Sequence, residues 1–166
     1  MLKVFDHCDH IDFRQLMDVY EQWNYAYGKG KYPKLSGNLQ ILYAEQDFYD
    51  FLLLFFATKN AKYFVWAPQG RYAAALRLEP YEDGLLIEAL ETRPDCRRKG
   101  YATDLINATI SYLRARGPYK IYSHVQKDNE ASLLVHYKCG FSILSENAMY
   151  IDGTYHNDAF TLVYKF

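Results

Sequence analysis

The chain has 166 residues, of which 50% are hydrophobic and 17% aromatic, and its formal net charge is −1. The high aromatic content excludes a disordered chain, and the length favours one domain, which we place at residues 1–166. Because the charge is close to zero, no global field attracts nucleic acid, and we expect no nucleic-acid partner.

Three cysteines stand far apart, at Cys8, Cys96 and Cys139, and no C-x-x-C pair occurs. An odd number of cysteines without a secretory signal predicts free thiols in a reducing compartment. The longest apolar run, FLLLFFA at 51–57, is far shorter than the ~20 residues that cross a bilayer. We therefore expect a cytoplasmic protein that does not span a membrane. The histidine spacings match no zinc pattern, so no metal is predicted.

The first third of the chain predicts two helices separated by a loop. Residues 12–24 carry apolar side chains at helical spacing after Asp12, a typical capping residue. The segment GKGKYPKLSGN, 28–38, is rich in Gly, Lys and Pro and predicts the loop. A second helix is predicted over residues 39–57, although the apolar end of this segment also fits a strand pattern.

The middle of the chain predicts three strands in an antiparallel meander. The strand-like runs are 62–67, 72–80 and 85–92, and a Pro-Gln-Gly turn and a Glu-Asp-Gly turn separate them. Residues 100–115 follow as an amphipathic helix that Gly117-Pro118 ends.

The last third predicts a strand, a short helix and a hairpin. The strand covers 119–126, and the helix covers 128–140 with Asp128 or Asn129 as its cap. Two final strands, 141–151 and 155–166, are joined by an Asp-Gly dipeptide that favours a tight hairpin. The predicted order is that of a single mixed α/β domain.

A cluster of cations, Arg97, Arg98 and Lys99, stands directly before Gly100, where a helix is predicted to begin. Cations at a helix start oppose the helix dipole, so we expect a bound anion to compensate them. Free backbone N–H groups at a helix start bind phosphate, and Gly100 and Ala102 allow close approach. Neither the P-loop pattern nor the dinucleotide fingerprint occurs in this chain, so a different polyanion site is predicted.

The pattern Arg97-x-x-Gly100-x-Ala102 resembles the (Q/R)-x-x-G-x-(G/A) motif of the GNAT superfamily of acetyl-CoA-dependent N-acetyltransferases. The step TRP at 92–94 stands where that family has a Val-x-Pro-like step. The segment NEASLLVHYKCGF, 129–141, is similar to the family's Asn-led helix that ends in Lys-x-Gly-Phe. The order of predicted elements fits the same family along essentially the whole chain.

The resemblance implies an α/β (α+β) fold, a twisted and splayed mixed sheet of about six to seven strands flanked by about four helices. It also implies acetyl-CoA as co-substrate, with the pantetheine arm along the backbone of 88–92 and the pyrophosphate on the N–H groups of 98–103. Asn129 either contacts the pantetheine or orders the loop. The implied cofactor-binding residues are Leu90, Thr92, Arg97, Arg98, Lys99, Gly100, Tyr101, Ala102, Thr103, Asn129 and Ser132.

Two glutamates, Glu88 and Glu91, are the candidates for the general base, acting directly or through a water. They lie on opposite faces of the strand unless a bulge intervenes. We prefer Glu88, because it sits in an apolar stretch where burial would raise its pKa. For either residue the alternative is an ordinary polar side chain on a half-exposed strand. Family precedent places the oxyanion on a backbone N–H, here around Leu90 to Thr92.

The family commonly has a tyrosine as proton donor four residues before the glycine of the Gly-Phe signature. His136 occupies this position and is the third catalytic candidate. A histidine with a near-neutral pKa is able to donate a proton. The alternative is that His136 only packs beside the cofactor thiol while the thiolate leaves unaided, since a thiol has a pKa of about 8.5.

The predicted function is an N-acetyltransferase that moves an acetyl group from acetyl-CoA to a primary amine of a small molecule. The reaction is expected to be direct attack through a tetrahedral intermediate. Two alternatives stay open: a protein or peptide N-acetyltransferase, and a non-catalytic acyl-CoA-binding sensory domain, which the missing tyrosine favours. The sequence is compatible with a monomer or a homodimer.

Overall fold

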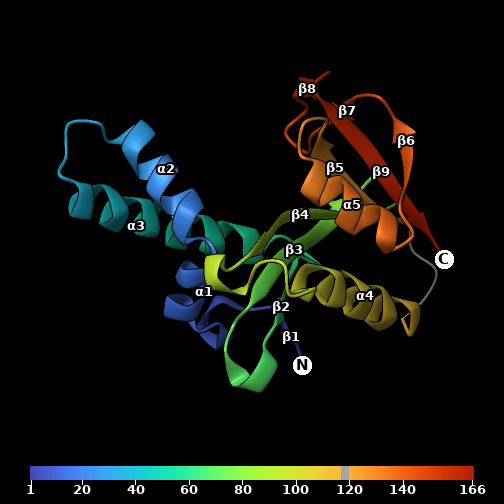
Figure 1. Ribbon diagram of the computed structural model, residues 1–166, viewed down its shortest axis with the longest axis horizontal. Coiled ribbons are helices and arrows are strands. Elements are labelled where there is room, and N and C mark those ends of the chain that lie inside the picture. The colour runs from blue at the N-terminus through green and yellow to red at the C-terminus, as the bar shows by residue number, and fades with distance from the viewer. Residues whose placement is uncertain (117–119) are drawn as a thin grey trace.

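The computed structural model describes residues 1–116 and 120–166 and shows a mixed sheet with helices on both faces (Figure 1). Its strands are β1 (Leu2–Phe5), β2 (Lys62–Trp66), β3 (Ala74–Tyr81), β4 (Gly84–Thr92), β5 (Lys120–Gln126), β6 (Ser142–Ser145), β7 (Ala148–Met149), β8 (Tyr155–His156) and β9 (Ala159–Lys165). Seven of them form one sheet in the order β1-β2-β3-β4-β5-β9-β6, and β7 and β8 form a separate hairpin in the described part of the chain.

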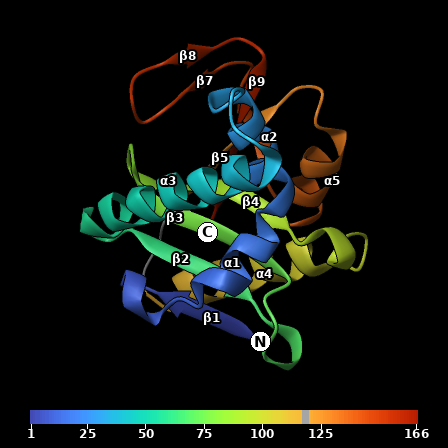
Figure 2. The ribbon, with the colours of Figure 1, turned by 90° about the vertical axis from the view of Figure 1, so that its left-hand side faces the viewer.

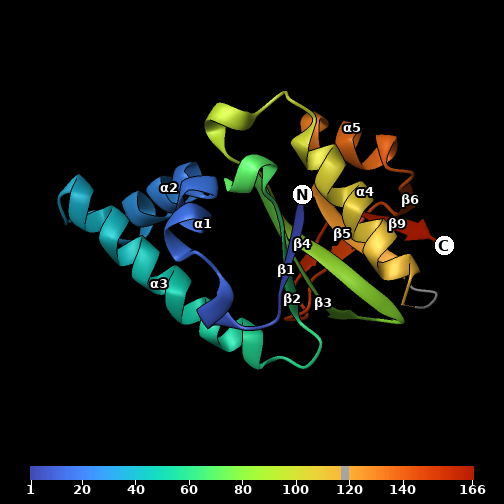
Figure 3. The same cartoon turned by 90° about the horizontal axis from the view of Figure 1, so that it is seen from below.

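The helices lie in two layers on either side of this sheet (Figure 3). They are α1 (Phe13–Val19), α2 (Glu21–Lys31), α3 (Gly37–Ala57), α4 (Tyr101–Arg114) and α5 (Glu130–Lys138). Short 3-10 turns η1 (Cys8–His10), η2 (Pro68–Gly70) and η3 (Pro94–Cys96) connect other elements. Helices α1, α2 and α3 cover one face of the sheet, and α4 covers the other with α5 beside it (Figures 1 and 2).

Each face of the sheet buries its own apolar cluster because side chains alternate along a strand. On β2, Tyr63 and Val65 pack with Leu16 and Leu52 in the cluster beneath α1 and α3. Phe64 points to the other cluster, which α4 covers. Burial on both faces fixes the register of β2 and β3, because a slip of one residue would exchange the two sets of side chains.

Strands β4 and β5 part midway along their length. Their parallel pairing runs only from Gly84 opposite Lys120 to Ile87 opposite Ser123. Beyond Ile87, β4 continues to Thr92 and β5 to Gln126 without pairing to each other. The sheet is therefore splayed on the side where β4 leads into η3 and α4, as the resemblance implied.

A β-bulge interrupts β4 directly after the point where the strands part. Ala75 pairs with Glu91 but Arg77 pairs with Glu88, so β4 holds an extra residue against β3. Ala89 carries the strain of this bulge, with φ of +49°, a value that non-glycine residues seldom adopt. Because of the extra residue, Glu88 and Glu91 lie on the same face of the sheet.

Several predicted boundaries in the N-terminal half are wrong. The helix expected over 12–24 is two helices that break at Tyr20. The expected loop 28–38 is shorter, since α2 runs to Lys31 and α3 begins at Gly37, which leaves only 32–36 between the helices. Strand β1 was not predicted, because four residues hold too little pattern.

In the C-terminal half, the Asp-Gly hairpin forms as predicted, but the strands on either side of it are each broken in two. The predicted stop at Gly117-Pro118 lies outside the described residues. No helix in residues 1–116 and 120–166 is long and apolar enough to cross a membrane.

The close approach of α2 and α3 gives a test of the packing. A Cβ atom added at the buried Gly28 would lie 2.8 Å from the carbonyl carbon of Gln40. We expect Gly28→Ala to lower the free energy of unfolding by about 1–3 kcal/mol. Gly30→Ala in the same helix meets no atom within 4 Å and is expected to be neutral or to stabilise by up to about 1 kcal/mol. Urea unfolding measures both, and equal effects would contradict the packing described here.

Candidate active site

A cavity of about 540 Å³ opens where β4 leaves β5. The end of β4, the loop through η3, the first turn of α4 and the start of α5 line it. Every residue that the sequence pointed to for cofactor binding lies on this cavity except Lys99. The Lys99 side chain instead donates a hydrogen bond to the backbone carbonyl of Asp95, at 2.8 Å. The structure thus brings the predicted cofactor residues together in one place.

The start of α4 presents unpaired backbone donors to this cavity. Gly100 caps the helix with φ of +84° and makes no side-chain capping bond. The first bond into the helix is from the N–H of Asp104 to the carbonyl of Gly100. Among the described residues, no hydrogen-bond acceptor is seen for the backbone N–H groups of 98–103. Such a row of free N–H groups at the positive end of a helix dipole fits a phosphate or pyrophosphate.

The cations before Gly100 have different surroundings. Arg97 is held by the protein itself, because its guanidinium donates to the Thr92 carbonyl, to Gln22 at 2.8 Å and to Glu91 at 3.1 Å. Arg98 is exposed, has φ of +61° and lines the cavity. Arg98 is therefore the cation placed to meet an anion, while Arg97 ties the loop to β4 and α2.

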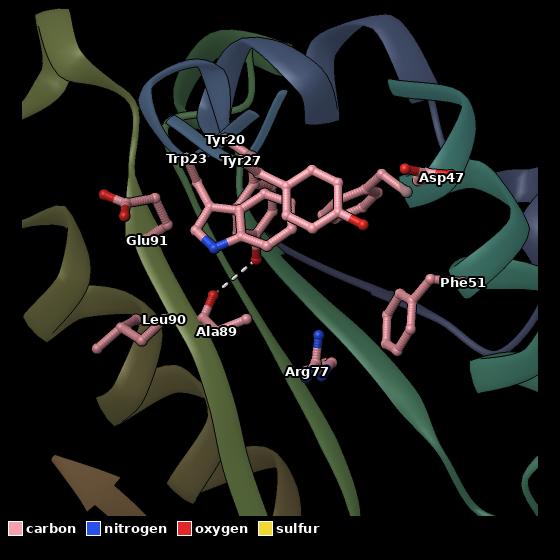
Figure 4. A pocket seen from close by; sticks show the side chains of 10 residues that line it. Tyr20, Trp23, Tyr27, Asp47, Phe51, Arg77, Ala89, Leu90 and Glu91 are labelled. Carbon is pink, nitrogen blue, oxygen red and sulfur yellow. Dashed lines mark hydrogen bonds between the residues drawn. The ribbon is translucent and has the colours of Figure 1, made fainter. Parts of the chain in front are cut away.

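A second cavity of about 370 Å³ lies on the other side of β4, between that strand and helices α2 and α3 (Figure 4). It is lined by Tyr20, Trp23, Tyr27, Asp47, Phe48, Phe51, Arg77, Ala89, Leu90 and Glu91. Leu90 and Glu91 line both cavities, so the two spaces meet at the bulge of β4. Sequence reasoning did not find the helical residues of this cavity, because their spacing is that of an ordinary buried helix face.

A buried tyrosine holds the bulge. The Tyr20 hydroxyl donates to the carbonyl oxygen of Ala89 at 2.7 Å and accepts from the Tyr63 hydroxyl at 3.0 Å (Figure 4). Burial raises the pKa of Tyr20 well above its usual value, so the hydroxyl stays protonated and keeps donating. The break between α1 and α2 at Tyr20 gives this side chain its position under β4.

Next to the bulge, an arginine of β3 forms ion pairs with two carboxylates of the sheet. Arg77 contacts Glu88 at 3.0 Å and Glu79 at 4.0 Å, and its guanidinium lies 4.6 Å from the ring centre of Phe51. Glu88 does not line the second cavity, because Arg77 stands there instead. Burial and the hydrogen bond to Glu88 raise the pKa of Glu79 to about 7. Glu79 was not singled out from the sequence, since nothing local marks its partners.

Glu91 stands at the junction of the two cavities. Its carboxylate accepts from Arg97 at 3.1 Å and from the backbone N–H of Thr92 at 3.0 Å. Both bonds go to Oε1. This carboxylate is thus oriented by its neighbours, and the residue Glu91 lines both the first and the second cavity.

His136 does not have the position that a proton donor needs. Its side chain is only 1% exposed and lines neither cavity. Nδ1 lies 2.8 Å from the carbonyl oxygen of Ser132, and the ring packs edge-on against Phe141. Burial lowers the pKa of His136, which favours the neutral ring. Of the two alternatives for His136, the burial argues against the proton donor, because the residue lies in the core and does not line the first cavity.

Asn129 caps α5, as its side chain accepts a hydrogen bond from the backbone N–H of Ser132 at 3.1 Å. Both residues line the first cavity, so the cap also shapes its wall. In residues 1–116 and 120–166, no group of three or more His, Cys, Asp or Glu side chains is arranged to hold a metal ion.

Comparison with known proteins gives one family. The sequence model of the acetyltransferase (GNAT) family matches residues 16–141. No curated protein sequence gives a significant match to this chain.

Solved structures share the fold at low sequence identity. A spermidine N-acetyltransferase chimera that includes the Vibrio cholerae enzyme has a TM-score of 0.68 and 19% identity, covering 99% of this chain and 95% of that chain. The PaiA N-acetyltransferase from Thermoplasma acidophilum, in complex with coenzyme A, has a TM-score of 0.65 and 14% identity over 100% and 99% of the two chains. The ribosomal-protein alanine N-acetyltransferase of Escherichia coli has a TM-score of 0.64 and 18% identity over 99% and 94%.

Replacing the exposed cation tests the phosphate site. We expect Arg98→Ala to weaken coenzyme A binding about tenfold, since it removes a charge-assisted hydrogen bond, and to reduce the salt dependence of binding. Titration calorimetry measures both quantities. The control is Arg116→Ala, just beyond the other end of α4, where the guanidinium donates to the carbonyl of Tyr112. This variant should bind coenzyme A normally. Pantetheine, which lacks the phosphates, should bind the two variants equally; an Arg98 effect on pantetheine would contradict a phosphate contact.

The raised pKa of Glu79 gives a prediction about stability. The pKa of Glu79 is its ordinary 4.5 in the unfolded chain and is raised to about 7 in the folded protein. The folded state therefore binds an extra proton between these values, and stability falls as the pH rises through this window. Glu79→Gln should have little effect at pH 5 and should stabilise the protein relative to wild type at pH 8. Urea unfolding at both pH values tests this, with the exposed Glu82→Gln as control.

Proposed function

The chain belongs to the GNAT family of acetyl-CoA-dependent acetyltransferases, and on this premise we propose that it acetylates the primary amine of a small molecule. The observation that carries the proposal is the meeting of the two cavities at Leu90 and Glu91. The larger cavity fits the co-substrate. The smaller one, walled by the side chains of α2 and α3, fits a compact amine and brings it to the same point of β4.

Acetyl-CoA fits the first cavity through the backbone. The free N–H groups of 98–103 suit its pyrophosphate. Beyond Ile87, β4 has no strand partner on the β5 side, so the backbone of Leu90 is open to the amides of the pantetheine arm, whereas the N–H and carbonyl of Thr92 are already bonded to Glu91 and Arg97. Binding of this kind resembles the addition of a strand to an open sheet edge. It would place the thioester near the bulge, where the second cavity begins; this is the proposed site of the amine and is called the amine cavity from here on.

The reaction needs a neutral amine, because an alkylamine has a pKa of about 10 and is mostly protonated at pH 7. The nitrogen lone pair attacks the thioester carbonyl carbon and a C–N bond forms. The resulting oxyanion accepts a hydrogen bond from a backbone N–H of β4 around Leu90. Collapse of the intermediate breaks the C–S bond. Starting from the ammonium, the nitrogen gives up two protons in all: one ends on the thiolate and one goes to solvent.

Glu91 is the proposed general base, acting through a water. The residue lines both cavities, and its carboxylate is oriented by Arg97 and the Thr92 N–H. Glu88 was preferred from sequence, but its carboxylate is paired with Arg77 and lies outside the amine cavity. We therefore assign Glu88 a positioning role, in which it holds Arg77 against Phe51.

The leaving group needs no dedicated acid in this proposal. A thiol with a pKa of about 8.5 leaves readily as the thiolate. His136, the residue in the expected donor position, is buried away from both cavities. Departure of the thiolate followed by protonation from water accounts for the reaction without it.

Release of free coenzyme A from acetyl-CoA tests the function. We expect turnover with small primary amines, and little with peptides that offer a free N-terminus or a lysine. Turnover with peptides alone would contradict the small-molecule assignment while leaving the acetyl-transfer chemistry in place.

The two glutamates are separated by matched variants. Glu91→Gln should lower kcat/KM by about 100-fold, the usual effect of removing a general base, with little change in acetyl-CoA affinity. The loss should shrink as the pH rises and more amine is already neutral. Glu88→Gln makes the same chemical change on the same face of β4 and should lower kcat/KM by a smaller factor. A larger loss with Glu88→Gln would identify Glu88, and not Glu91, as the general base.

A further inference from the structure

The amine cavity is built mainly from aromatic rings, and we infer that its substrate is an arylalkylamine, an aromatic ring on a short alkyl arm that ends in the primary amine. This inference rests on the proposed acetyl transfer and names the class of amine. It follows from the walls of the cavity, from the charges within it and from its size.

The walls present flat ring faces. The rings of Trp23 and Tyr27 are stacked with centroids 4.8 Å apart and an angle of 14° between their planes. Phe48 lies edge-on to Trp23 with ring centroids 6.0 Å apart, and the centroid of Phe51 lies 6.1 Å from that of Phe48. Trp23 is 48% exposed although it forms a wall of the cavity. A large ring left open to solvent beside an apolar hollow favours a ligand with a π-face of its own.

The charges in the cavity disfavour a substrate with several cations. Arg77 stands in the wall, and both carboxylates that line the cavity have cationic partners. Asp47 pairs with Lys31 at 2.9 Å, and Glu91 with Arg97 at 3.1 Å. A polyamine would bring a second cation near these groups without finding an unpaired carboxylate. A monoamine has only one charge, which Glu91 and the aromatic ring faces receive.

The two ends of the cavity differ in chemistry. Figure 4 shows Glu91 and Asp47 on opposite sides of the aromatic side chains. Lys31 and the Tyr32 hydroxyl both donate to Oδ2 of Asp47, and the Tyr27 hydroxyl lies close to the same carboxylate. With the amine at the Glu91 end, a hydroxyl on the far side of the ring would donate to the Asp47 carboxylate. A phenolic amine is therefore the preferred member of the class.

The size agrees with this choice. An apolar cavity of about 150 Å³ is enough to hold benzene. The cavity of about 370 Å³ leaves room for a ring, a two-carbon arm and a ring hydroxyl.

An amine series tests the inference with acetyl-CoA saturating and coenzyme A release as the signal. The probes are tyramine, 2-phenylethylamine, 2-cyclohexylethylamine and spermidine. We expect kcat/KM for 2-phenylethylamine to exceed that for 2-cyclohexylethylamine, which has similar bulk but no π-face, by about five- to tenfold. Tyramine should be at least as good as 2-phenylethylamine, and spermidine should be the poorest.

Variants connect the preference to the cavity. Trp23→Leu should bring the ratio of kcat/KM for 2-phenylethylamine to that for 2-cyclohexylethylamine close to one. Tyr25→Leu, on the same helix but 53% exposed and outside the cavity, should keep the advantage. Asp47→Asn should narrow the ratio of tyramine to 2-phenylethylamine, a ratio that a general loss of activity would leave unchanged. Circular dichroism and thermal melts confirm that each variant is folded.

The outcomes separate the inference from the proposed function. Equal rates for phenyl and cyclohexyl amines, or a preference for spermidine or peptides, would overturn the inference and leave acetyl transfer intact. If no amine is acetylated although acetyl-CoA binds, the proposed function fails. Calorimetry of 2-phenylethylamine with coenzyme A-loaded protein then decides the inference by itself: absence of binding, or binding unchanged by Trp23→Leu, would refute it.

Discussion

The site depends on one hydrogen bond, from the buried Tyr20 hydroxyl to the carbonyl of Ala89. Ala89 has φ of +49°, a strained conformation that persists only where its surroundings hold it. Tyr20 supplies that support from the break between α1 and α2, and Tyr63 donates to the same hydroxyl. The extra residue of the bulge then sets what each side chain of β4 faces. Without it, Glu88 and Glu91 would point to opposite faces of the sheet.

The same bulge lies just beyond the last paired residues of β4 and β5. Parting of the strands frees backbone groups on one side of β4, and the bulge turns Glu91 toward both cavities. The two cavities, which we propose for the amine and the co-substrate, therefore meet at one point from opposite sides of a single strand. Both features are needed: a splayed sheet without the bulge would open the first cavity but would leave no oriented carboxylate at its inner end.

Sequence was most informative where the determinants are local. The cations, Gly100 and Ala102 lie within six consecutive positions, and the helix start that they predict lines the first cavity. It was least informative where partners are distant. Tyr20 and Ala89 are separated by 69 positions, so no local sequence pattern around either residue indicates their hydrogen bond. The orientation of His136 depends on tertiary packing too, because its ring packs against Phe141 and is buried in the core, which a helical pattern alone does not fix.

The aromatic wall of the second cavity depends on how two helices pack against each other. Trp23 and Tyr27 come from α2, and Phe48 and Phe51 from α3, so the width of the cavity is fixed by how closely these helices approach. Gly28 allows that approach, because any larger side chain would meet the backbone at Gln40. Arg77 limits the floor of the same space and is held there by Glu88. Gly28, which lines neither cavity, thus sets how closely the two helices approach and with it the width of the second cavity.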